Sequence, residues 1–371
     1  MSITSESFNS VKDPKKYEEI SRIYTIGSSY GFEAAVLSYG ARINKLIVKD
    51  KNGNDVDVML GYKNLDSYLT DGCFHGAVVG RSANRVAGHS FVIDGNRYEI
   101  PANEGPTNLH TGPEAFQNVF WDGEILSVED TNALILDSGI AGIPMSDGEG
   151  LLLSYVSPDG SCGFPGNLDT KVLYTWTEDK TFLILYIAET DKATMFAPTN
   201  HSYFNLSGHD YGDVSDMLIL IDSDEVTVKD ELNCPNGELL KVDGTDFDCR
   251  ELTFVQKLLE SEDPQIKSCK GIDQNYNLKT SFDKYSFGAS LTDPNSGITM
   301  EMFTNMPGVQ VYGGNHLSGG EQKGEKPYKS YSGMCLEAQL IPNAINVPSL
   351  GDPVIRPGET KYYACGYKFS V

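Results

Sequence analysis

The stretch from Ala197 to Gly208 carries the densest group of side chains that could do chemistry. It reads Ala-Pro-Thr-Asn-His-Ser-Tyr-Phe-Asn-Leu-Ser-Gly and combines an imidazole with amides, hydroxyls and aromatic rings. Amides and hydroxyls match the donors and acceptors of a polyhydroxylated ligand, and histidine titrates near neutral pH. The stretch therefore indicates a site that binds a hydroxyl-rich molecule and moves a proton at His201. The alternative is a strand end with an ordinary hydrogen-bonded histidine.

A second candidate is an acid inside an apolar run. The segment Met334-Cys-Leu-Glu-Ala-Gln339 is typical of a strand. Because side chains alternate along a strand, Glu337 and Cys335 share a face that lies opposite Leu336. If that face lines a cleft, burial raises the pKa of Glu337 toward the range that a general base needs near neutral pH. If the face meets bulk water, Glu337 is a solvated surface acid.

Three further polar clusters could contribute to a binding site. Gly80-Arg-Ser-Ala-Asn84-Arg85 sets an amide beside a guanidinium, which is a fork of donors for ligand oxygens. Thr107-Asn-Leu-His110 offers a second histidine in a turn-rich stretch, and Gly271-Ile-Asp273-Gln-Asn places an acid among amides. Each also has a simpler interpretation as a turn with an exposed polar residue.

Several common functional motifs are missing from the sequence. We find no phosphate-binding glycine loop, no dinucleotide fingerprint, no His-Glu-x-x-His and no Gly-x-Ser-x-Gly. The six histidines show no metal-ligand spacing, and the seven cysteines include no Cys-x-x-Cys. The sequence therefore predicts neither a metal nor a cofactor.

The charge of the chain limits its partners. A formal net charge of −23 repels phosphate backbones and anionic membrane surfaces, so we expect no nucleic-acid and no membrane partner. A neutral small molecule fits this charge best. The N-terminus lacks a basic region followed by an apolar run, and no apolar run could span a bilayer. Two glycosylation sequons, at Asn200 and Asn205, lie inside the candidate site, and a glycan at either would block it. We therefore expect a cytoplasmic protein, which is not glycosylated there.

Short apolar or alternating runs separated by turn residues predict many strands. The clearest hairpin is Phe91 to Ile100 around Asp94-Gly-Asn, and another joins Phe287–Thr292 to Thr299–Phe303. Helical periodicity is scarce, with candidates at Asn64–Leu69 and Leu252–Glu260. Other predicted strands are Ala133–Leu136, Leu151–Val156, Thr170–Thr177, Phe182–Glu189, Met217–Ile221, Glu225–Val228, Val309–Tyr312, Gly333–Gln339 and Tyr362–Phe369.

Many short strands with 37 glycines and 17 prolines favour an all-β sandwich with few short helices. No Ser- or Pro-rich linker divides the chain, and no repeat of fixed period occurs. We therefore predict a polar N-terminal lead-in over residues 1–20, followed by a single β-sandwich catalytic domain over residues 21–371.

Taken together, the clusters closely resemble the aldose 1-epimerase (galactose mutarotase) family. The matching segments span nearly the whole chain, and the most specific are the run ending at Leu206 and the segment around Glu337. In chain order they are Gly80-Arg-x-Ala-Asn-Arg, Asn108-Leu-His-x-Gly, Pro198-Thr-Asn-His-Ser-Tyr-Phe-Asn-Leu, Asp273-x-Asn, Pro307-Gly-Val-Gln-x-Tyr-x-Gly-Asn and Cys335-Leu-Glu-x-Gln-x-x-Pro.

The resemblance implies a large antiparallel β-sandwich of the galactose mutarotase type with an open sugar-binding groove. It implies interconversion of the α and β anomers of aldohexoses such as galactose and glucose, without a cofactor. By the same resemblance, Glu337 is the general base, His201 the general acid, and His110 a second histidine near the ring oxygen. The sugar-binding positions that it implies are Asn84, Arg85, Asp273 and Gln310.

The sequence departs from the usual family pattern beside the groove. Thr111 follows His110 where glycine is common, Gln274-Asn-Tyr follows Asp273 where His-Asn-Phe is common, and Gly313 stands where threonine is common. These changes leave the sugar preference open. Two alternatives also remain at this stage, a hexose-6-phosphate epimerase and a sugar-binding protein without turnover. A hexose-6-phosphate epimerase would need positive charge near C6 of the sugar, and basic residues are sparse around these motifs. A protein that only binds sugar would not need the acid–base pair of Glu337 and His201.

Overall fold

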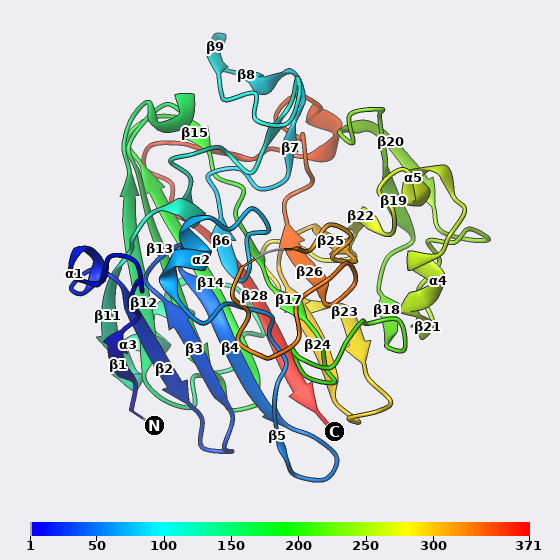
Figure 1. Cartoon of the computed structure of the whole chain (residues 1–371). Coiled ribbons are helices and arrows are strands. Elements are labelled where there is room, and N and C mark those ends of the chain that lie inside the picture. Colours follow the sequence, from blue (N-terminus) through cyan, green and yellow to red (C-terminus); the bar gives the residue numbers. More distant parts are fainter. Residues whose placement is uncertain (1, 319) are drawn as a thin grey trace.

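A computed structural model describes residues 2–318 and 320–371. The chain folds into stacked antiparallel sheets with a few short helices around them (Figure 1). The predicted all-β sandwich is confirmed. Within the described residues, no helix combines the length and the apolar character needed to cross a membrane.

A nine-stranded sheet forms the largest layer. Its order is β11-β12-β13-β14-β28-β24-β23-β18-β21, with every neighbouring pair antiparallel. The strands are β11 (Asp122–Leu126), β12 (Gly150–Ser157), β13 (Leu168–Trp176), β14 (Thr181–Thr190), β18 (Leu218–Ile221), β21 (Thr253–Phe254), β23 (Ser286–Thr292), β24 (Thr299–Thr304) and β28 (Lys361–Ser370).

Two smaller sheets pack against this layer. One has the order β1-β2-β3-β4-β5 and the other β17-β26-β25-β22-β19-β20. Their strands are β1 (Thr4–Ser7), β2 (Arg22–Gly27), β3 (Glu33–Leu37), β4 (Arg42–Lys49), β5 (Asp55–Asp57), β17 (Tyr203–Phe204), β19 (Glu225–Lys229), β20 (Pro235–Lys241), β22 (Asp273–Asn277), β25 (Gly308–Tyr312) and β26 (Met334–Gln339).

Four two-stranded ladders complete the β structure. They pair β16 with β6, β10 with β7, β8 with β9 and β15 with β27. Their bounds are β6 (Ala77–Val79), β7 (Arg85–Val86), β8 (Ser90–Ile93), β9 (Asn96–Glu99), β10 (Asn108–Leu109), β15 (Thr194–Met195), β16 (Thr199–His201) and β27 (Val354–Ile355). The hairpin predicted from Phe91 to Ile100 is the β8–β9 pair.

The helices are short. They are α1 (Pro14–Tyr17), α2 (Leu65–Leu69), α3 (Val128–Asp137), α4 (Val255–Leu259) and α5 (Pro264–Lys267), with 3-10 turns η1 (Ala87–His89), η2 (Phe116–Asn118), η3 (Ser161–Gly163) and η4 (Pro348–Leu350). Helix α2 confirms the prediction at Asn64–Leu69. Helix α4 occupies the C-terminal part of the predicted Leu252–Glu260, and Thr253–Phe254 form strand β21 instead.

The predicted strand Ala133–Leu136 is wrong, because these residues lie in α3. The side chain of Ser127 caps this helix by accepting from the backbone N–H of Asp130, and acidic residues occupy the first turn. Both features stabilise a helix N-terminus. An unbroken apolar run fits a helix as well as a buried strand, so the capping residues upstream decide the outcome.

Strand β14 shows how alternation builds the core. Phe182, Ile184 and Tyr186 point into the main core between the large sheet and the smaller sheets. Leu183 and Leu185 point to the other face, where they join the apolar side of α3. Because both faces are covered, β14 is apolar throughout most of its length and lies in the middle of the large sheet.

Buried polar groups join the layers at defined points. Trp176 Nε1 donates to Ile26 O at 3.1 Å, Tyr174 OH to Ala41 O at 2.6 Å, and Tyr367 OH to Leu336 O at 3.0 Å. The last bond fixes the strand that carries Glu337 onto the large sheet. The boundary after residue 20 stays a prediction; β1, which precedes it, pairs with β2, which follows it.

Candidate active site

The seven residues that the sequence predicts for the site line one open cavity of about 310 Å³. They come from β16, β22, β25, β26 and the segments around β7 and β10. A cavity of this size is in the range of small-molecule sites. The residues are Asn84, Arg85, His110, His201, Asp273, Gln310 and Glu337.

Neighbouring strands of the six-stranded sheet place polar side chains in two rows. In the first row, Gln310 of β25 pairs with Glu337 of β26 on one side and with Asn275 of β22 on the other. In the second row, Tyr312 pairs with Cys335 and with Asp273. Directly paired residues lie on the same face of a sheet, and residues two apart share it. Strand register therefore gathers segments that are far apart in sequence.

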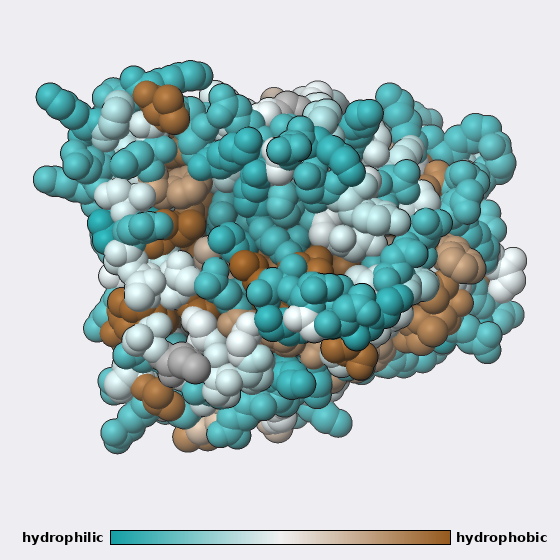
Figure 2. All heavy atoms as spheres, turned by 60° about the horizontal axis from the view of Figure 1, so that its bottom comes forward, coloured by the Kyte–Doolittle hydropathy of each residue, from teal (hydrophilic) through white to brown (hydrophobic). Residues whose placement is uncertain are grey.

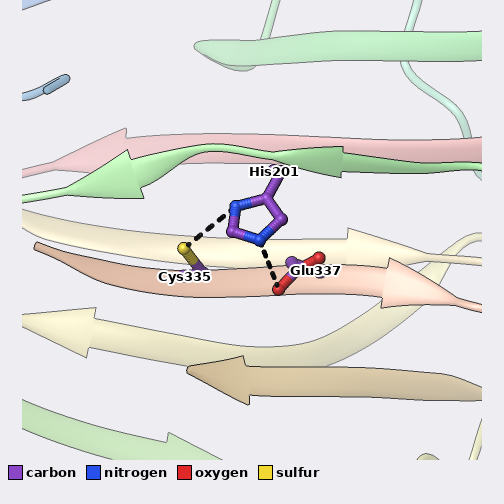
Figure 3. Close-up of side chains that lie close together, drawn as sticks. All are labelled: His201, Cys335 and Glu337. Atoms are coloured by element: carbon purple, nitrogen blue, oxygen red, sulfur yellow. Dashed lines mark hydrogen bonds and ion pairs between the residues drawn. The ribbon is translucent and has the colours of Figure 1, made fainter. Parts of the chain in front are cut away.

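His201 faces this sheet from β16. Its Nε2 lies 3.7 Å from Glu337 Oε1, and its Nδ1 lies 3.7 Å from Cys335 Sγ (Figure 3). All three side chains are buried. The imidazole is thus held between a carboxyl group and a thiol that project from the same strand face. This confirms the alternation predicted for Cys335 and Glu337.

His110 is held in one tautomer by the backbone. The backbone N–H of Asn84 donates to His110 Nδ1 at 3.1 Å, and the N–H of His110 donates back to Asn84 O at 3.0 Å. Nδ1 is therefore an acceptor, and the neutral ring carries its hydrogen on Nε2. The φ angle is 56° at Asn84 and 52° at His110, so both residues adopt an unusual backbone conformation at the site.

The departure at Thr111 has a structural reason. Thr111 has a φ of 72°, a region that favours glycine. Its hydroxyl donates to Ser82 O at 3.0 Å and accepts from Ser82 N–H at 2.9 Å. These two bonds join the His110 segment to the Gly80–Arg85 segment, and they offset the cost of the conformation.

Arg81 and Arg85 lie close in the sequence, but their guanidinium groups point in different directions. Arg81 points away from the cavity into a buried nest, where it donates to the backbone carbonyls of Ser157, Pro158, Pro165 and Gly166. Arg85 points into the cavity and binds Glu104 in a fork, with Nε–Oε2 at 2.6 Å and Nη2–Oε1 at 2.8 Å.

A chain of amides holds the second acid of the cavity. Gln310 Nε2 donates to Asp273 Oδ1 at 2.6 Å, and Gln339 Nε2 donates to Gln310 Oε1 at 3.1 Å. Arg85 Nη1 lies 3.9 Å from Asp273 Oδ2. The Asp273 carboxylate therefore has a fixed orientation before any ligand arrives.

The two buried carboxyl groups differ in their ionisation. Burial opposes the charge of Asp273, but the charges of Lys229 and Arg85 outweigh it and lower its pKa. Burial, together with the charge of Asp273, raises the pKa of Glu337 well above its usual value. The protonated form of Glu337 and the ionised form of Asp273 are therefore favoured.

Burial has the opposite effect on the two histidines. It lowers the pKa of His201 to about 4, with a further contribution from His75, and it lowers the pKa of His110 well below its usual value. In the free site, burial therefore favours the uncharged forms of both His201 and Glu337.

Sequence reasoning missed several lining residues. The Phe74 ring lies 4.7 Å from the ring of His110 and 5.8 Å from that of His201, between centroids. Glu104 and Tyr312 also line the cavity. The positive φ of Phe74, 60°, belongs to a loop conformation that no local sequence signal indicates.

His201, Cys335 and Glu337 each offer an atom that could bind a metal, and these atoms lie within 4.8 Å of one another. The imidazole, however, turns Nδ1 toward the thiol and Nε2 toward the carboxyl group (Figure 3). A metal ion binds one nitrogen, along its lone pair in the ring plane, and would lie away from the group at the other nitrogen. This arrangement fits an imidazole with a polar partner at each nitrogen better than a three-ligand metal centre.

Comparison with known proteins agrees with this geometry. The family model described as Aldose 1-epimerase matches residues 22–368. Galactose mutarotase from Homo sapiens is 38% identical over 338 residues, covering 91% of this chain and 90% of that protein. Aldose 1-epimerase from Escherichia coli K12 is 30% identical over 350 residues, covering 94% of this chain and 95% of that protein.

Among solved structures, the GalM/aldose epimerase homologue from C. elegans superposes with a TM-score of 0.81 at 26% identity, covering 94% of this chain and 99% of that one. The sequence match and the superposition both extend over nearly the full length, including every strand that carries a candidate site residue. The chain belongs to the aldose 1-epimerase family.

Proposed function

We propose that Glu337 and His201 are the acid–base pair with which this chain interconverts the α and β anomers of aldohexoses such as galactose and glucose. The observation that carries this proposal is their contact at 3.7 Å inside a cavity lined with groups that bind hydroxyls. The ring oxygen and the C1 hydroxyl of a pyranose are bonded to the same carbon. Two neighbouring protein groups can therefore reach both oxygens from one side of the sugar.

The reaction needs one proton on the pair. For ring opening, Glu337 takes the proton of the C1 hydroxyl while His201 donates a proton to the ring oxygen, and the C1–O5 bond breaks. Rotation about C1–C2 exposes the other face of the aldehyde. Ring closure reverses both transfers and begins with the proton on Glu337, the arrangement that burial favours in the free site. Each positioned transfer contributes roughly 10²- to 10⁴-fold.

The remaining residues bind and orient the sugar. His110 presents its Nε2–H to the sugar near the ring oxygen, because its Nδ1 is already occupied by the Asn84 backbone. Asp273 accepts from sugar hydroxyls as a carboxylate, and Arg85 donates to sugar oxygens. Asn84 and Gln310 supply amides beside them.

A polarimetric assay tests the proposal. Freshly dissolved α-galactose and α-glucose should relax to anomeric equilibrium faster with the wild-type protein than without it. Glu337→Gln keeps the shape of the side chain and removes the base, so it should lose roughly 10²-fold or more of the acceleration. Equal rates for the wild type and this variant would remove Glu337 from the mechanism.

The cavity does not favour the phosphosugar alternative. Of the described residues that line it, one is a permanent cation, Arg85, and three are acids, Glu104, Asp273 and Glu337. Glu104 already engages the guanidinium of Arg85. A sugar-binding protein without turnover is also disfavoured, because binding alone needs no carboxyl group with a raised pKa next to an imidazole.

We also propose that the protein acts in the cytoplasm, in galactose or glucose metabolism, and binds no nucleic acid. Asn200 and Asn205 of the two sequons are buried and hydrogen-bonded, so neither offers a place for a glycan in the folded chain. All seven cysteines are free thiols, as is usual in a reducing compartment. The net charge of −23 disfavours polyanionic partners.

A further inference from the structure

His201 has two ring nitrogens, and the acid–base role occupies only one of them. Nε2 faces Glu337, and Nδ1 faces Cys335 Sγ at 3.7 Å (Figure 3). A histidine that exchanges a proton at one nitrogen works best when a fixed partner holds the hydrogen of the other. Among the described residues, Cys335 is the polar side chain recorded within bonding distance of Nδ1.

We propose that Cys335 is a positioning residue, whose sulfur accepts the Nδ1–H of His201 and so keeps Nε2 as the nitrogen that exchanges a proton with the sugar. The inference rests on the proposed function, since it gives His201 the role of general acid. In the proposed mechanism, His201 remains protonated on Nδ1 after it has given its Nε2 proton to the ring oxygen. The sulfur holds that hydrogen throughout the cycle.

The position of Cys335 on its strand supports this role. Cys335 and Glu337 are two residues apart on β26, so one strand face supplies a partner to each nitrogen of the imidazole. Cys335 pairs with Tyr203 of β17, and Tyr203 follows the end of β16 closely in the chain. The thiol is fully buried among Leu60, Tyr203 and other apolar groups, so water does not compete for Nδ1.

The neutral state of the thiol matters as much as its position. Burial raises the pKa of Cys335 well above its usual value, and the nearby Glu337 adds to this, so the sulfur stays uncharged. An aspartate in its place would stabilise the imidazolium and make His201 a weaker acid. A neutral acceptor orients the ring and leaves the pKa of His201 low.

In the described part of the chain, the other groups around His201 do not offer a bond to Nδ1. The rings of Tyr203, His110, Phe74 and Tyr312 pack against the imidazole with centroids 5.0, 5.5, 5.8 and 6.1 Å away. Glu337 contacts the opposite nitrogen. The more distant charges of Asp71 and Asp273 act on His201 only through space.

The test measures two quantities, the tautomer of His201 by NMR and the steady-state constants kcat and KM. Protein labelled with ¹⁵N in the histidine rings is observed without substrate at neutral pH, and His201→Gln identifies the His201 signals among the six histidines. We expect wild-type His201 to be neutral with its hydrogen on Nδ1. Cys335→Ala should shift the hydrogen to Nε2, lower kcat about tenfold and leave KM within about twofold, since the sugar contacts remain.

Two further variants make the result specific. Cys335→Ser keeps an oxygen that can accept Nδ1–H, so it should restore the Nδ1–H tautomer and most of the lost kcat. Cys249→Ala removes a buried thiol that does not line the cavity, and it should change neither the tautomer nor kcat. It therefore measures what loss of a buried sulfur does by itself.

The outcomes separate this inference from the proposed function. Wild-type His201 with its hydrogen on Nε2, or a Cys335→Ala variant with unchanged tautomer and unchanged kcat, overturns the role of Cys335 while leaving mutarotation intact. A wild-type protein that does not accelerate mutarotation overturns the proposed function. The tautomer is measured on the free protein, so its result does not depend on the assay.

Discussion

At the scale of single residues, the site depends on the difference between two buried carboxyl groups. Asp273 is surrounded by Lys229, Arg85 and the amide of Gln310, which together favour its charged form. Glu337 lies beside His201, and burial, followed by the charge of Asp273, raises its pKa and favours its protonated form. One acid is therefore suited to holding sugar hydroxyls and the other to moving protons, a division set by their surroundings.

The low pKa of His201 gives a prediction about pH. The pair needs one proton, and a second proton on His201 stops Glu337 from acting as the base. Because the pKa of His201 is about 4, kcat/KM for galactose should stay level as the pH falls from 7 and decline only near pH 4. An acid limb centred near the ordinary histidine value of about 6.5 would contradict the burial of His201 in the working enzyme.

The fork between Glu104 and Arg85 gives a prediction about sugar binding. Glu104→Gln keeps the size of the side chain but weakens two charge-assisted bonds that hold the guanidinium in place. We expect KM for galactose to rise several-fold with kcat nearly unchanged, in steady-state assays. Glu99→Gln, at an exposed position on the neighbouring hairpin, should leave both constants unchanged. A fall in kcat with constant KM would place Glu104 in the chemical step instead.

At the scale of secondary-structure elements, the loop between α2 and β6 is held by one buried acid. Asp71 accepts from Arg42 Nη1 at 2.9 Å and from the backbone N–H groups of Cys73 and His75 at 2.8 and 2.7 Å. This network fixes the turn that brings Phe74 against the two histidines of the site. The rings that line the cavity are thus supported by a charge cluster that does not itself line it.

Replacing Asp71 should lower stability strongly at neutral pH. Asp71→Asn leaves Arg42 buried without a counter-charge, which costs about 3–5 kcal/mol of the free energy of unfolding. Urea denaturation measures this loss. Asp55→Asn breaks the exposed pair with Lys49 and should cost less than about 1 kcal/mol. Equal losses for the two variants would show that the buried pair has no special role.

The same substitution has a defined pH dependence. Burial opposes the charge of Asp71, but its partners, His75 first and then Arg42, lower its pKa in the folded protein. The stabilisation is therefore fully present above the unfolded pKa of about 3.9 and is lost as the pH falls toward the folded value. The difference in stability between the wild type and Asp71→Asn should narrow below about pH 4.

Elements with clear local signals could be predicted from the sequence. Strand β14 has an unbroken apolar stretch from Phe182 to Ala188, and the β8–β9 hairpin has Asp94-Gly-Asn at its turn. Alternation also placed Cys335 and Glu337 on one face. The run Ala133–Leu136 was ambiguous because four apolar residues in a row have no period, and Ser127 was the signal that could have resolved it.

At the scale of the whole molecule, the contacts that make the site could not be predicted from local patterns. His201 and Glu337 meet because β16 and β26 lie together in the fold, and neither segment encodes that partner locally. The resemblance to a family predicted which residues gather, but not their geometry. It did not indicate the thiol at Nδ1 of His201, the fork at Arg85 or the position of Phe74.

The charge of the whole molecule gives a prediction about substrates. With a net charge of −23 and the ionised form of Asp273 favoured in the cavity, the protein repels anionic sugars. We expect kcat/KM for galactose 6-phosphate to be at least about tenfold below that for galactose at low salt. Added salt should reduce the difference in kcat/KM between the two sugars, because it screens the repulsion of the phosphate. The rate with neutral galactose should barely change. A preference for the phosphosugar would instead support the alternative epimerase activity.

We propose that Glu337 and His201 act as one unit on one sugar. Anomer exchange of [1-¹³C]galactose at equilibrium, followed by NMR, measures this directly in Glu337→Gln, His201→Gln and the double variant. We expect each single variant to lose roughly 10²- to 10⁴-fold and the double variant to be no slower than the slower single one, because groups that act together are not additive. A single variant with the wild-type exchange rate, or losses that multiply in the double variant, would contradict the account.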